Sequence, residues 1–335
     1  MLGRIALFLV IIYVVFNAMF LRWAVEKQPL TFDDDEEHFN ATLAKLLKPR
    51  FVGSQGHDEV RDFIEMELKR LHFTTLRNEF QEGGVNLTNL VGFWNMGARF
   101  YLMLTCHYDS KRPETENGTT DEFLGATESA VSCAILLNVA KKLKPLLMEK
   151  WSKKSDFGLA FIFFDGHNPL SSDPYDEHQI MGSRHFIDEE FIPLENMAVA
   201  VTLSYIGAPN QTFLSYFEVT NDLHNMIADI EVALRRSGQL DDCHLLFEKK
   251  THYDNDLLDD HISFDEFDVP VLHVGPQEFP NVVYTTADNA ENLHYPTIRN
   301  MIKIIRIFVY NFFEMWKTFV KSRDTIKMNY DFYDD

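Results

Sequence analysis

Imidazole and carboxylate side chains stand directly after several apolar runs of this sequence. His107 and Asp109 form an H-x-D pair, and His167 lies three residues beyond the run FIFF. Such side chains hold zinc through nitrogen and oxygen atoms, and a catalytic zinc needs about three protein ligands and one open position. A histidine can also move protons near neutral pH. These residue types indicate zinc chemistry or proton transfer. The plainer alternative is that His107 and His273 are core histidines, hydrogen-bonded within strands.

Four short apolar or β-branched runs are expected to position these groups as strands. They span residues 99–105, 159–164, 198–203 and 269–274. Helical patterns lie between them, for example over 129–143, and an amphipathic helix is predicted over 57–71. The alternation predicts a single α/β domain with a central, mostly parallel mixed β-sheet covered by helices on both faces. Ligands in such sheets bind beyond the carboxyl ends of the strands, which is where the polar residues fall.

A set of motifs occurs in a recognisable order over roughly residues 50 to 317. They are VGSQG (52–56), CHYDSK (106–111), GATESAVSC (125–133), FFDG (163–166), GSRHF (182–186), IGAPN (206–210), DDHISF (259–264), VPVLHV (269–274) and ADNAENL (287–293). This set resembles the glutaminyl-peptide cyclotransferases, zinc acyltransferases related to the M28 aminopeptidases. The resemblance implies an M28 zinc-peptidase-like (phosphorylase/hydrolase-like) domain over residues 49–335.

The resemblance implies three zinc ligands, and all three positions are altered. Glu128 replaces an Asp, Asn168 replaces a Glu, and Tyr284 replaces a His. Glu128 can still ligate, but its extra methylene moves the oxygen by roughly an ångström, where catalysis tolerates about half that. A neutral amide is a poor zinc ligand, and a phenol with a reference pKa near 10 stays protonated at neutral pH. Zinc, the family's cofactor, is therefore expected to be absent or weakly bound.

The catalytic positions implied by the resemblance are mostly changed as well. His167 stands in place of the Glu that acts as general acid and base, and Ser204 in place of an Asp of the proton network. Asp259, Asp260 and His273 match that network. The sequence therefore favours a catalytically impaired or inactive member, a pseudoenzyme with a retained fold.

The implied substrate pocket has lost its aromatic platform. Val283 replaces the Trp that stacks on the substrate glutamine, and Phe279 is a further pocket position. Two alternatives to the inactive protein stay open. One is an active zinc-dependent cyclotransferase that forms N-terminal pyroglutamate on secretory peptides, with His107 joining Glu128 and His167 around a displaced metal. The other is a membrane-anchored binding glycoprotein.

The amino terminus points to the secretory pathway. Residues 5–21 are uncharged and apolar between Arg4 and Arg22, about the lower limit for crossing a bilayer. We expect a signal anchor or signal peptide over residues 1–25, with the domain lumenal or extracellular, in the Golgi or endoplasmic reticulum or secreted. An acidic linker and a lead-in helix are expected over 26–48, with 31–38 solvated.

Sequons and cysteines agree with that compartment. Potential glycosylation sites stand at Asn40, Asn86, Asn117 and Asn210. Of the three cysteines, Cys106 and Cys133 occupy the positions at which the secreted cyclotransferases carry a disulfide beside the active site, whereas Cys243 is expected to be a lone thiol.

Composition excludes one class of partner. The formal net charge of −20 argues against a nucleic-acid surface, which needs clustered Lys and Arg. The 46% hydrophobic content is enough for a large core. Residues 297–320 are apolar but carry charges, which predicts a packing helix rather than a membrane span. Secreted peptides or proteins are the expected partners, and the oligomeric state is left open.

Overall fold

A computed structural model describes residues 35–112, 123–151, 155–170, 179–253 and 258–330, with side chains as far as residue 316. The expected signal segment, residues 1–25, and the sequon at Asn117 lie outside the described residues. None of the helices within the described ranges combines the length and the apolar character that a membrane crossing requires.

Helices and strands alternate through most of the chain. The helices are α2 (Glu36–Leu46), α3 (Gln55–Arg70), α4 (Val131–Lys150), α5 (Met181–Asp188), α6 (Asn221–Arg236), α7 (His261–Asp265) and α8 (Tyr295–Tyr330). The strands are β1 (Thr74–Glu82), β2 (Val85–Phe93), β3 (Phe100–His107), β4 (Phe157–Phe164), β5 (Met197–Leu203), β6 (Phe213–Ser215), β7 (Phe247–Thr251) and β8 (Val271–Val274).

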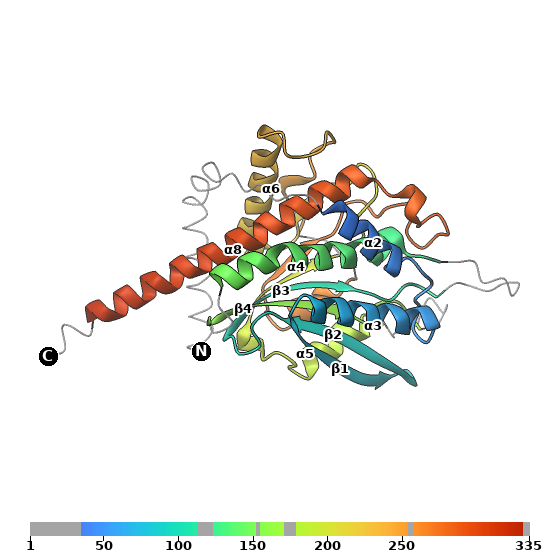
Figure 1. Cartoon of the computed structure of the whole chain (residues 1–335), viewed down its shortest axis with the longest axis horizontal. Coiled ribbons are helices and arrows are strands. Elements are labelled where there is room, and N and C mark those ends of the chain that lie inside the picture. The colour runs from blue at the N-terminus through green and yellow to red at the C-terminus, as the bar shows by residue number, and fades with distance from the viewer. Residues whose placement is uncertain (1–34, 113–122, 152–154, 171–178, 254–257, 331–335) are drawn as a thin grey trace, which may run out of the picture.

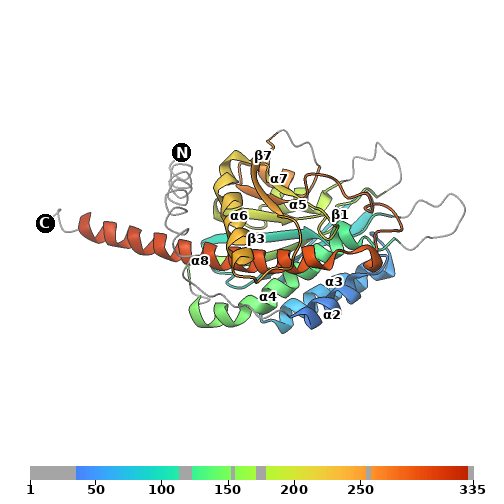
Figure 2. The ribbon, with the colours of Figure 1, turned by 90° about the horizontal axis from the view of Figure 1, so that it is seen from above.

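The main sheet has six strands in the order β1-β2-β4-β3-β5-β8. Strands β4, β3, β5 and β8 run parallel to one another, whereas β1 and β2 form an antiparallel hairpin at one edge and β2 pairs antiparallel with β4. Figure 2 shows α2, α3 and α4 on one side of this sheet and α5 and α7 on the other. The prediction of a mostly parallel mixed sheet covered on both faces is confirmed.

The central strands bury both of their faces, so side chains alternate between two cores. In β3, Leu102 and Leu104 contact the core beneath α4 and α8, whereas Met103 contacts the core beneath α5 and α7. In β4, Phe163 and Phe164 divide between the two cores in the same way. Burial on both faces explains why these strands read as continuous apolar runs. Their carboxyl ends are thereby held rigidly at one edge of the sheet.

Several elements depart from the sequence-based expectation. The hairpin of β1 and β2 was not predicted, since β1 is largely exposed and polar and its apolar spacing is weak. Helix α2 begins at Glu36, inside the run 31–38 expected to be a solvated linker, and buries His38 and Phe39 against the body. The expected helix over 297–320 is confirmed as part of α8, which extends beyond the rest of the body in Figure 1.

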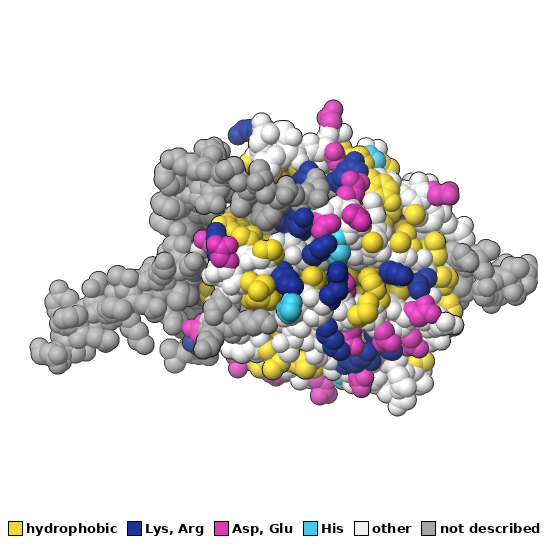
Figure 3. All heavy atoms as spheres, viewed as in Figure 1, with side chains coloured by type: hydrophobic (Ala, Val, Ile, Leu, Met, Phe, Trp, Pro, Cys, Tyr) yellow, Lys and Arg dark blue, Asp and Glu magenta, His cyan; other side chains and the backbone are white. Residues whose placement is uncertain are grey.

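The surface shown in Figure 3 carries no continuous basic patch. Lys and Arg side chains are interspersed there with Asp, Glu and apolar groups. Exposed ion pairs such as Arg77 with Glu65 and Lys69 with Glu65 belong to this mixed surface.

Candidate functional site

The predicted site residues lie at the carboxyl ends of the parallel strands. His107 ends β3, His167 and Asn168 follow β4, Ser204 follows β5, and His273 lies within β8. These side chains are almost completely buried. The structure thus brings together residues separated by more than 160 positions, as the strand pattern predicted.

The His167 side chain is the centre of a hydrogen-bonded series. Its Nδ1 lies 3.0 Å from Asp260 Oδ2, and its Nε2 lies 3.2 Å from the Tyr205 hydroxyl. The Tyr205 hydroxyl in turn lies 3.3 Å from that of Tyr284. We call Asp260, His167, Tyr205 and Tyr284 the His167 series. Tyr205 and Tyr284 both have left-handed backbone, with φ of 56° and 61°, a costly conformation for bulky residues that tends to occur at functional sites.

Burial alone would lower the pKa of His167, but Asp260, Asp259 and Asp109 outweigh it and raise the pKa to about 10. The imidazole is therefore a cation at neutral pH. Burial raises the pKa of the Tyr284 phenol well above its ordinary value, with a further contribution from the Glu128 carboxyl. About 38% of Tyr284 is exposed, yet its hydroxyl points inward to Tyr205. Tyr284 is therefore a neutral phenol at the partly exposed end of the His167 series.

His107 and His167 stack on one another, with ring centroids 3.8 Å apart and planes at 9°. The nitrogen lone pairs that bind metal lie in the ring planes. Two stacked, nearly parallel planes do not meet at a nearby point. These two histidines therefore cannot both ligate one ion, and the rearranged set of His107, Glu128 and His167 is not assembled in this structure.

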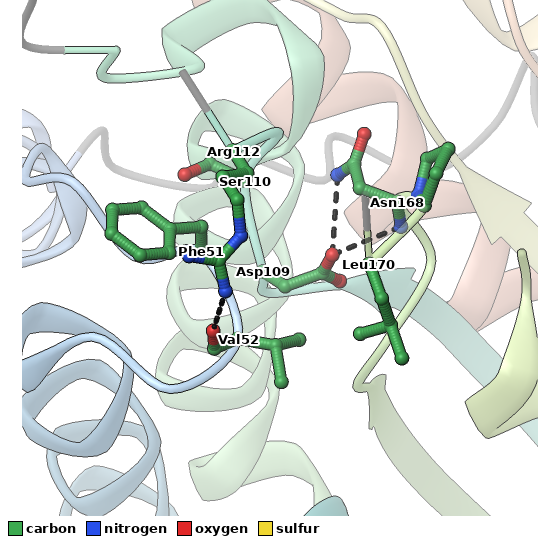
Figure 4. A pocket seen from close by; sticks show the side chains of 8 residues that line it. Phe51, Val52, Asp109, Ser110, Arg112, Asn168 and Leu170 are labelled. Carbon is green, nitrogen blue, oxygen red and sulfur yellow. Dashed lines mark hydrogen bonds between the residues drawn. The ribbon is translucent and has the colours of Figure 1, made fainter. Parts of the chain in front are cut away.

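Asn168 is engaged by Asp109 rather than presented to a metal. The Asp109 carboxylate accepts the backbone N–H of His167 at 3.1 Å, that of Asn168 at 3.0 Å and the Asn168 Nδ2–H at 3.2 Å, the last two drawn in Figure 4. Burial opposes the charge of Asp109, but these bonds and His107 hold its pKa below its usual range. The carboxylate fixes the turn that follows β4.

Glu128 sits in a π-helical turn, Ala126–Ala130, at the start of α4. The Asp288 carboxylate accepts the backbone N–H groups of Thr127 and Glu128, at 2.6 and 3.0 Å. Arg50, itself buried, donates to Gly125 O at 2.8 Å. Both Glu128 carboxyl oxygens are buried without a hydrogen-bond partner, and burial raises the pKa of this group. Glu128 is therefore held in place as a poorly solvated carboxyl.

Ser204, Asp259 and His273 form a second hydrogen-bonded group. Asp259 Oδ2 lies 2.9 Å from His273 Nε2 and accepts a bond from the Ser204 hydroxyl, which also lies 3.2 Å from His273 Nε2. Burial and the neighbouring His261 lower the pKa of His273 to about 4, so its imidazole is neutral. His107 and His273 are thus buried and hydrogen-bonded at or within strands, as the plainer interpretation predicted.

Glu128, Asn168 and Tyr284, the residues that the resemblance assigns to zinc, provide a buried carboxyl, an amide bound to Asp109 and a protonated phenol, which suit zinc poorly. Among the described residues, two groups of three ligand atoms lie within 4.8 Å of one another: Asp259, His261 and His273, and His167, Asp259 and Asp260. The ligand atoms of each group are close enough together to bind one metal ion. In the first, however, the two imidazoles stack at 4.1 Å and 24°, so their lone pairs diverge. In the second, the His167 Nδ1 atom that would have to bind the metal is already paired with the Asp260 carboxylate.

Val283 and Phe279, the two residues expected in the substrate pocket, differ in their exposure to solvent. Val283 is buried, whereas Phe279 is 43% exposed and packs near Tyr205 and Tyr284, with ring centroids at 4.9 and 5.6 Å. Phe279, Tyr205 and Tyr284 therefore form an aromatic cluster beside the His167 series. The Lys111 ammonium lies 5.0 Å from the centre of the Tyr284 ring, where it adds a cation to the rim.

The cysteine pair is adjacent but not bonded. Cys106 and Cys133 are free thiols whose Sγ atoms lie 2.9 Å apart, so the bridge implied by the resemblance is not formed in this structure. Cys243 is also a free thiol and is partly exposed. The sequon residues Asn40, Asn86 and Asn210 are exposed, as a glycan would require.

Sequence reasoning missed four residues that shape the site. Tyr205, Asp288 and His261 contact His167, the Glu128 backbone and His273, and Arg50 holds the turn before Glu128 through Gly125 O. All four stand within or close to quoted motifs, which was the available signal. Tyr205 directly precedes the IGAPN motif, but nothing in its spacing shows that its hydroxyl faces His167.

Known proteins define the class to which this architecture belongs. The profile described as Peptidase family M28 matches residues 89–309. Among solved structures, a glutaminyl cyclase from Macrostomum lignano superposes with a TM-score of 0.75 at 26% identity, covering 84% of this chain and 90% of that one. A Bacteroides thetaiotaomicron leucine aminopeptidase precursor shares the fold, with a TM-score of 0.68 at 16% identity over 83% of this chain and 97% of its own.

Closer sequence relatives narrow the class. A glutaminyl-peptide cyclotransferase from Drosophila melanogaster is 35% identical over 293 residues, 82% of this chain and 80% of its own. A glutaminyl-peptide cyclotransferase-like protein from Bos taurus is 32% identical over 293 residues, 82% of this chain and 75% of its own. The chain therefore belongs to the glutaminyl-peptide cyclotransferase family within peptidase family M28.

Proposed function

We propose that this protein is a catalytically silent member of the cyclotransferase family, which uses its cleft for binding instead of zinc-dependent cyclisation. The observation that carries the proposal is the His167 series. His167 and Tyr284 stand where the family has a general acid/base and a zinc ligand. Here both are already satisfied by protein groups, Asp260 and Tyr205.

The chemistry of cyclisation supports this interpretation. An N-terminal glutamine closes when its α-amine attacks the side-chain amide carbon, the new C–N bond forms and ammonia leaves. The step needs an electrophile that polarises the carbonyl oxygen and a base that carries a proton from the amine to the ammonia. A cationic His167 has no lone pair free to take that proton, and a phenol at Tyr284 does not supply a metal ligand.

One observation favours a second candidate, a metal held at a shifted place. Glu128 Oε1 and Oε2 and His107 Nε2 are buried without hydrogen-bond partners. Buried polar atoms of this kind are commonly satisfied by a water or an ion. Two side chains fall short of the three ligands that zinc requires, so this candidate needs water to complete the site.

The test combines metal content with turnover. The purified protein, dialysed against metal-free buffer, is expected to hold far less than one zinc per chain and to leave a Gln-initiated peptide uncyclised even when zinc is supplied. The Drosophila melanogaster relative, treated in parallel, serves as the control. One zinc per chain, together with turnover that Glu128→Ala abolishes, would overturn the proposal.

Partners and compartment belong to the same proposal. Secreted peptides or proteins are the expected ligands, in a lumenal or extracellular setting reached through the apolar amino terminus. The exposure of Asn40, Asn86 and Asn210 supports this setting. Treatment of the secreted or membrane-bound protein with a glycosidase should lower its apparent mass.

A further inference from the structure

Strand β1 (Thr74–Glu82) forms one edge of the main sheet, and most of its side chains are exposed. In Figure 1 the strand lies along the lower margin of the body. Native proteins protect such edges with Pro, Lys, a bulge or a covering segment, because an unprotected edge accepts another strand. Strand β1 contains neither Pro nor Lys, and its pairing with β2 runs over nine residues without a bulge. The backbone of β1 therefore lacks the usual protection against pairing.

The backbone groups on the outer side of β1 belong to alternating residues. Glu79 pairs with Thr88 of β2, but both backbone groups of Thr88 point away from β1. The Thr88 N–H donates to Asp165 Oδ2 at 2.8 Å, and its carbonyl accepts from the Tyr108 hydroxyl at 3.0 Å. Glu79 and Thr88 are therefore a pair without mutual hydrogen bonds, and such pairs alternate with bonded ones along an antiparallel ladder. The residues whose N–H and C=O groups face outward are Thr75, Arg77, Glu79 and Gln81. Within the described ranges, none of these groups has a backbone partner on the outer side.

The charges on this edge are complementary to a second copy of the same strand. When two copies of β1 pair antiparallel about a two-fold axis at Asn78, Arg77 of each lies directly opposite the partner's Glu79. Opposite charges that face each other across an antiparallel pair stabilise it, and like charges destabilise it. The neighbouring registers, centred on Arg77 or on Glu79, place two Arg or two Glu side chains opposite each other. Charge therefore selects one register, in which the outward backbone groups of the two strands also meet.

Both charged side chains are available for this contact. Arg77 donates from Nε to Glu65 Oε2 at 3.1 Å and from Nη2 to Asp62 Oδ1 at 3.0 Å, which fixes it on the α3 side of the sheet. A guanidinium has five N–H donors, so Arg77 can also bind a carboxylate of the partner. Glu79 is exposed and has no ion pair with any residue that the structure describes.

The same register covers apolar surface on the opposite face of the strand. Leu76, which is 39% exposed, lies opposite the partner's Phe80. The Phe80 ring is half-buried and stacks on His185 of α5, with ring centroids 4.2 Å apart. The two-fold axis repeats this contact on the other side of Asn78. Apolar burial thus adds to the backbone and charge complementarity.

We propose that β1 is a dimerisation edge, through which two copies of this chain pair antiparallel with Arg77 of each opposite the partner's Glu79. The two six-stranded sheets then form one continuous sheet. A strand of nine residues a side is small beside the roughly 20–30 residues of a stable interface, so we expect dissociation in the micromolar range. The net charge of −20 opposes association, but salt at physiological strength screens it beyond about 8 Å. The inference goes beyond the proposed function and does not depend on it.

The experiment is sedimentation equilibrium of the full chain at physiological salt, from about 1 to 300 µM, the range that brackets micromolar dissociation. The protein is treated with a glycosidase so that its mass reports the number of chains, and a density-matched detergent disperses the apolar amino terminus. We expect the average mass to rise from one chain toward two. The mass of one chain at every concentration would overturn the inference.

A charge reversal and its matched control place the contact on β1. Glu79→Arg sets two Arg–Arg pairs across the two-fold axis and should weaken association at least about tenfold. Glu82→Arg makes the same change of charge on the same strand, but its opposite residue is the neutral Thr74, so association should change less than about twofold. Both glutamates are exposed, so both variants should fold, and their melting temperatures check this. Equal association of the two variants would overturn the inference, as it would if another part of the chain drove dimerisation.

Mixing two variants tests the register itself. Arg77→Glu alone sets Glu opposite Glu and should associate as weakly as Glu79→Arg. An equimolar mixture of the two restores an Arg–Glu pair at both positions, so we expect a dimer at least about tenfold tighter than either variant forms alone. A mixture no tighter than the separate variants would overturn the assigned register. Arg77 also binds α3, so the melting temperature of Arg77→Glu is measured first, and the comparison of Glu79→Arg with Glu82→Arg stands even if Arg77→Glu does not fold.

Discussion

The His167→Gln substitution probes whether a buried cation holds the site together. Glutamine keeps a polar side chain near Asp260 but removes the positive charge from a group of buried carboxylates. Breaking a buried ion pair by removing one partner costs about 3–5 kcal/mol. The raised pKa of His167, about 10 in the folded protein against 6.5 for a free histidine, corresponds to a stabilisation of the same order. We therefore expect the free energy of unfolding at pH 6 to fall by about 3–5 kcal/mol.

The pH dependence gives the prediction its sharpest test. A histidine whose pKa is raised on folding stabilises the protein fully below its unfolded pKa, and that contribution is lost as pH rises through the folded value. The difference between wild type and His167→Gln should therefore be largest below about pH 6.5 and should shrink toward pH 10. Urea unfolding at pH 6, 8 and 9.5 measures it, and comparing two proteins at each pH cancels the other titrating groups.

A matched control separates charge from packing. His224 is equally buried, lies 2.8 Å from Glu248 O and has a pKa lowered by burial, so it is neutral. His224→Gln should cost about 1 kcal/mol, the contribution of one neutral hydrogen bond, with no trend between pH 7 and 9.5. A His167→Gln variant as stable as wild type at pH 6, or a stability loss that does not diminish with pH, would refute the argument that His167 is a structural cation.

Three further substitutions test the turn that holds Glu128. Burial raises the pKa of Glu128, which destabilises the fold above its unfolded pKa, so Glu128→Gln should unfold at higher urea than wild type at pH 8, and the gain should vanish as pH falls below about 4.5. Gly125→Ala should lower the free energy of unfolding by about 2 kcal/mol or more, since φ is 51° and a Cβ would lie 2.2 Å from Glu128 Oε2; an unchanged melting temperature would contradict this. Arg50→Met removes charged hydrogen bonds to Tyr108 O, Gly125 O and Ser129 Oγ, at 2.8, 2.8 and 2.6 Å, and should cost about 3 kcal/mol or more by urea unfolding.

Local sequence patterns were enough to predict the core of the fold. The strands later seen as β3, β4, β5 and β8 were each expected to within two residues of their observed ends. They are buried on both faces, which makes them continuous apolar runs that are easy to recognise. Strand β1 was not predicted, because an exposed edge strand does not need that composition, and the buried strand β2 was missed as well.

The sequence alone determined that polar residues follow the carboxyl ends of parallel strands, and its resemblance to the family predicts that other residue types hold the zinc and acid/base positions. It could not determine what those residues do instead. Only the tertiary structure pairs His167 with Asp260 and Tyr205, stacks His107 on it, and aims the Asn168 amide oxygen away from Asp109. Strand composition is a local property, whereas hydrogen bonds, ring stacking and pKa values depend on atoms brought together by packing over distances of tens to hundreds of residues.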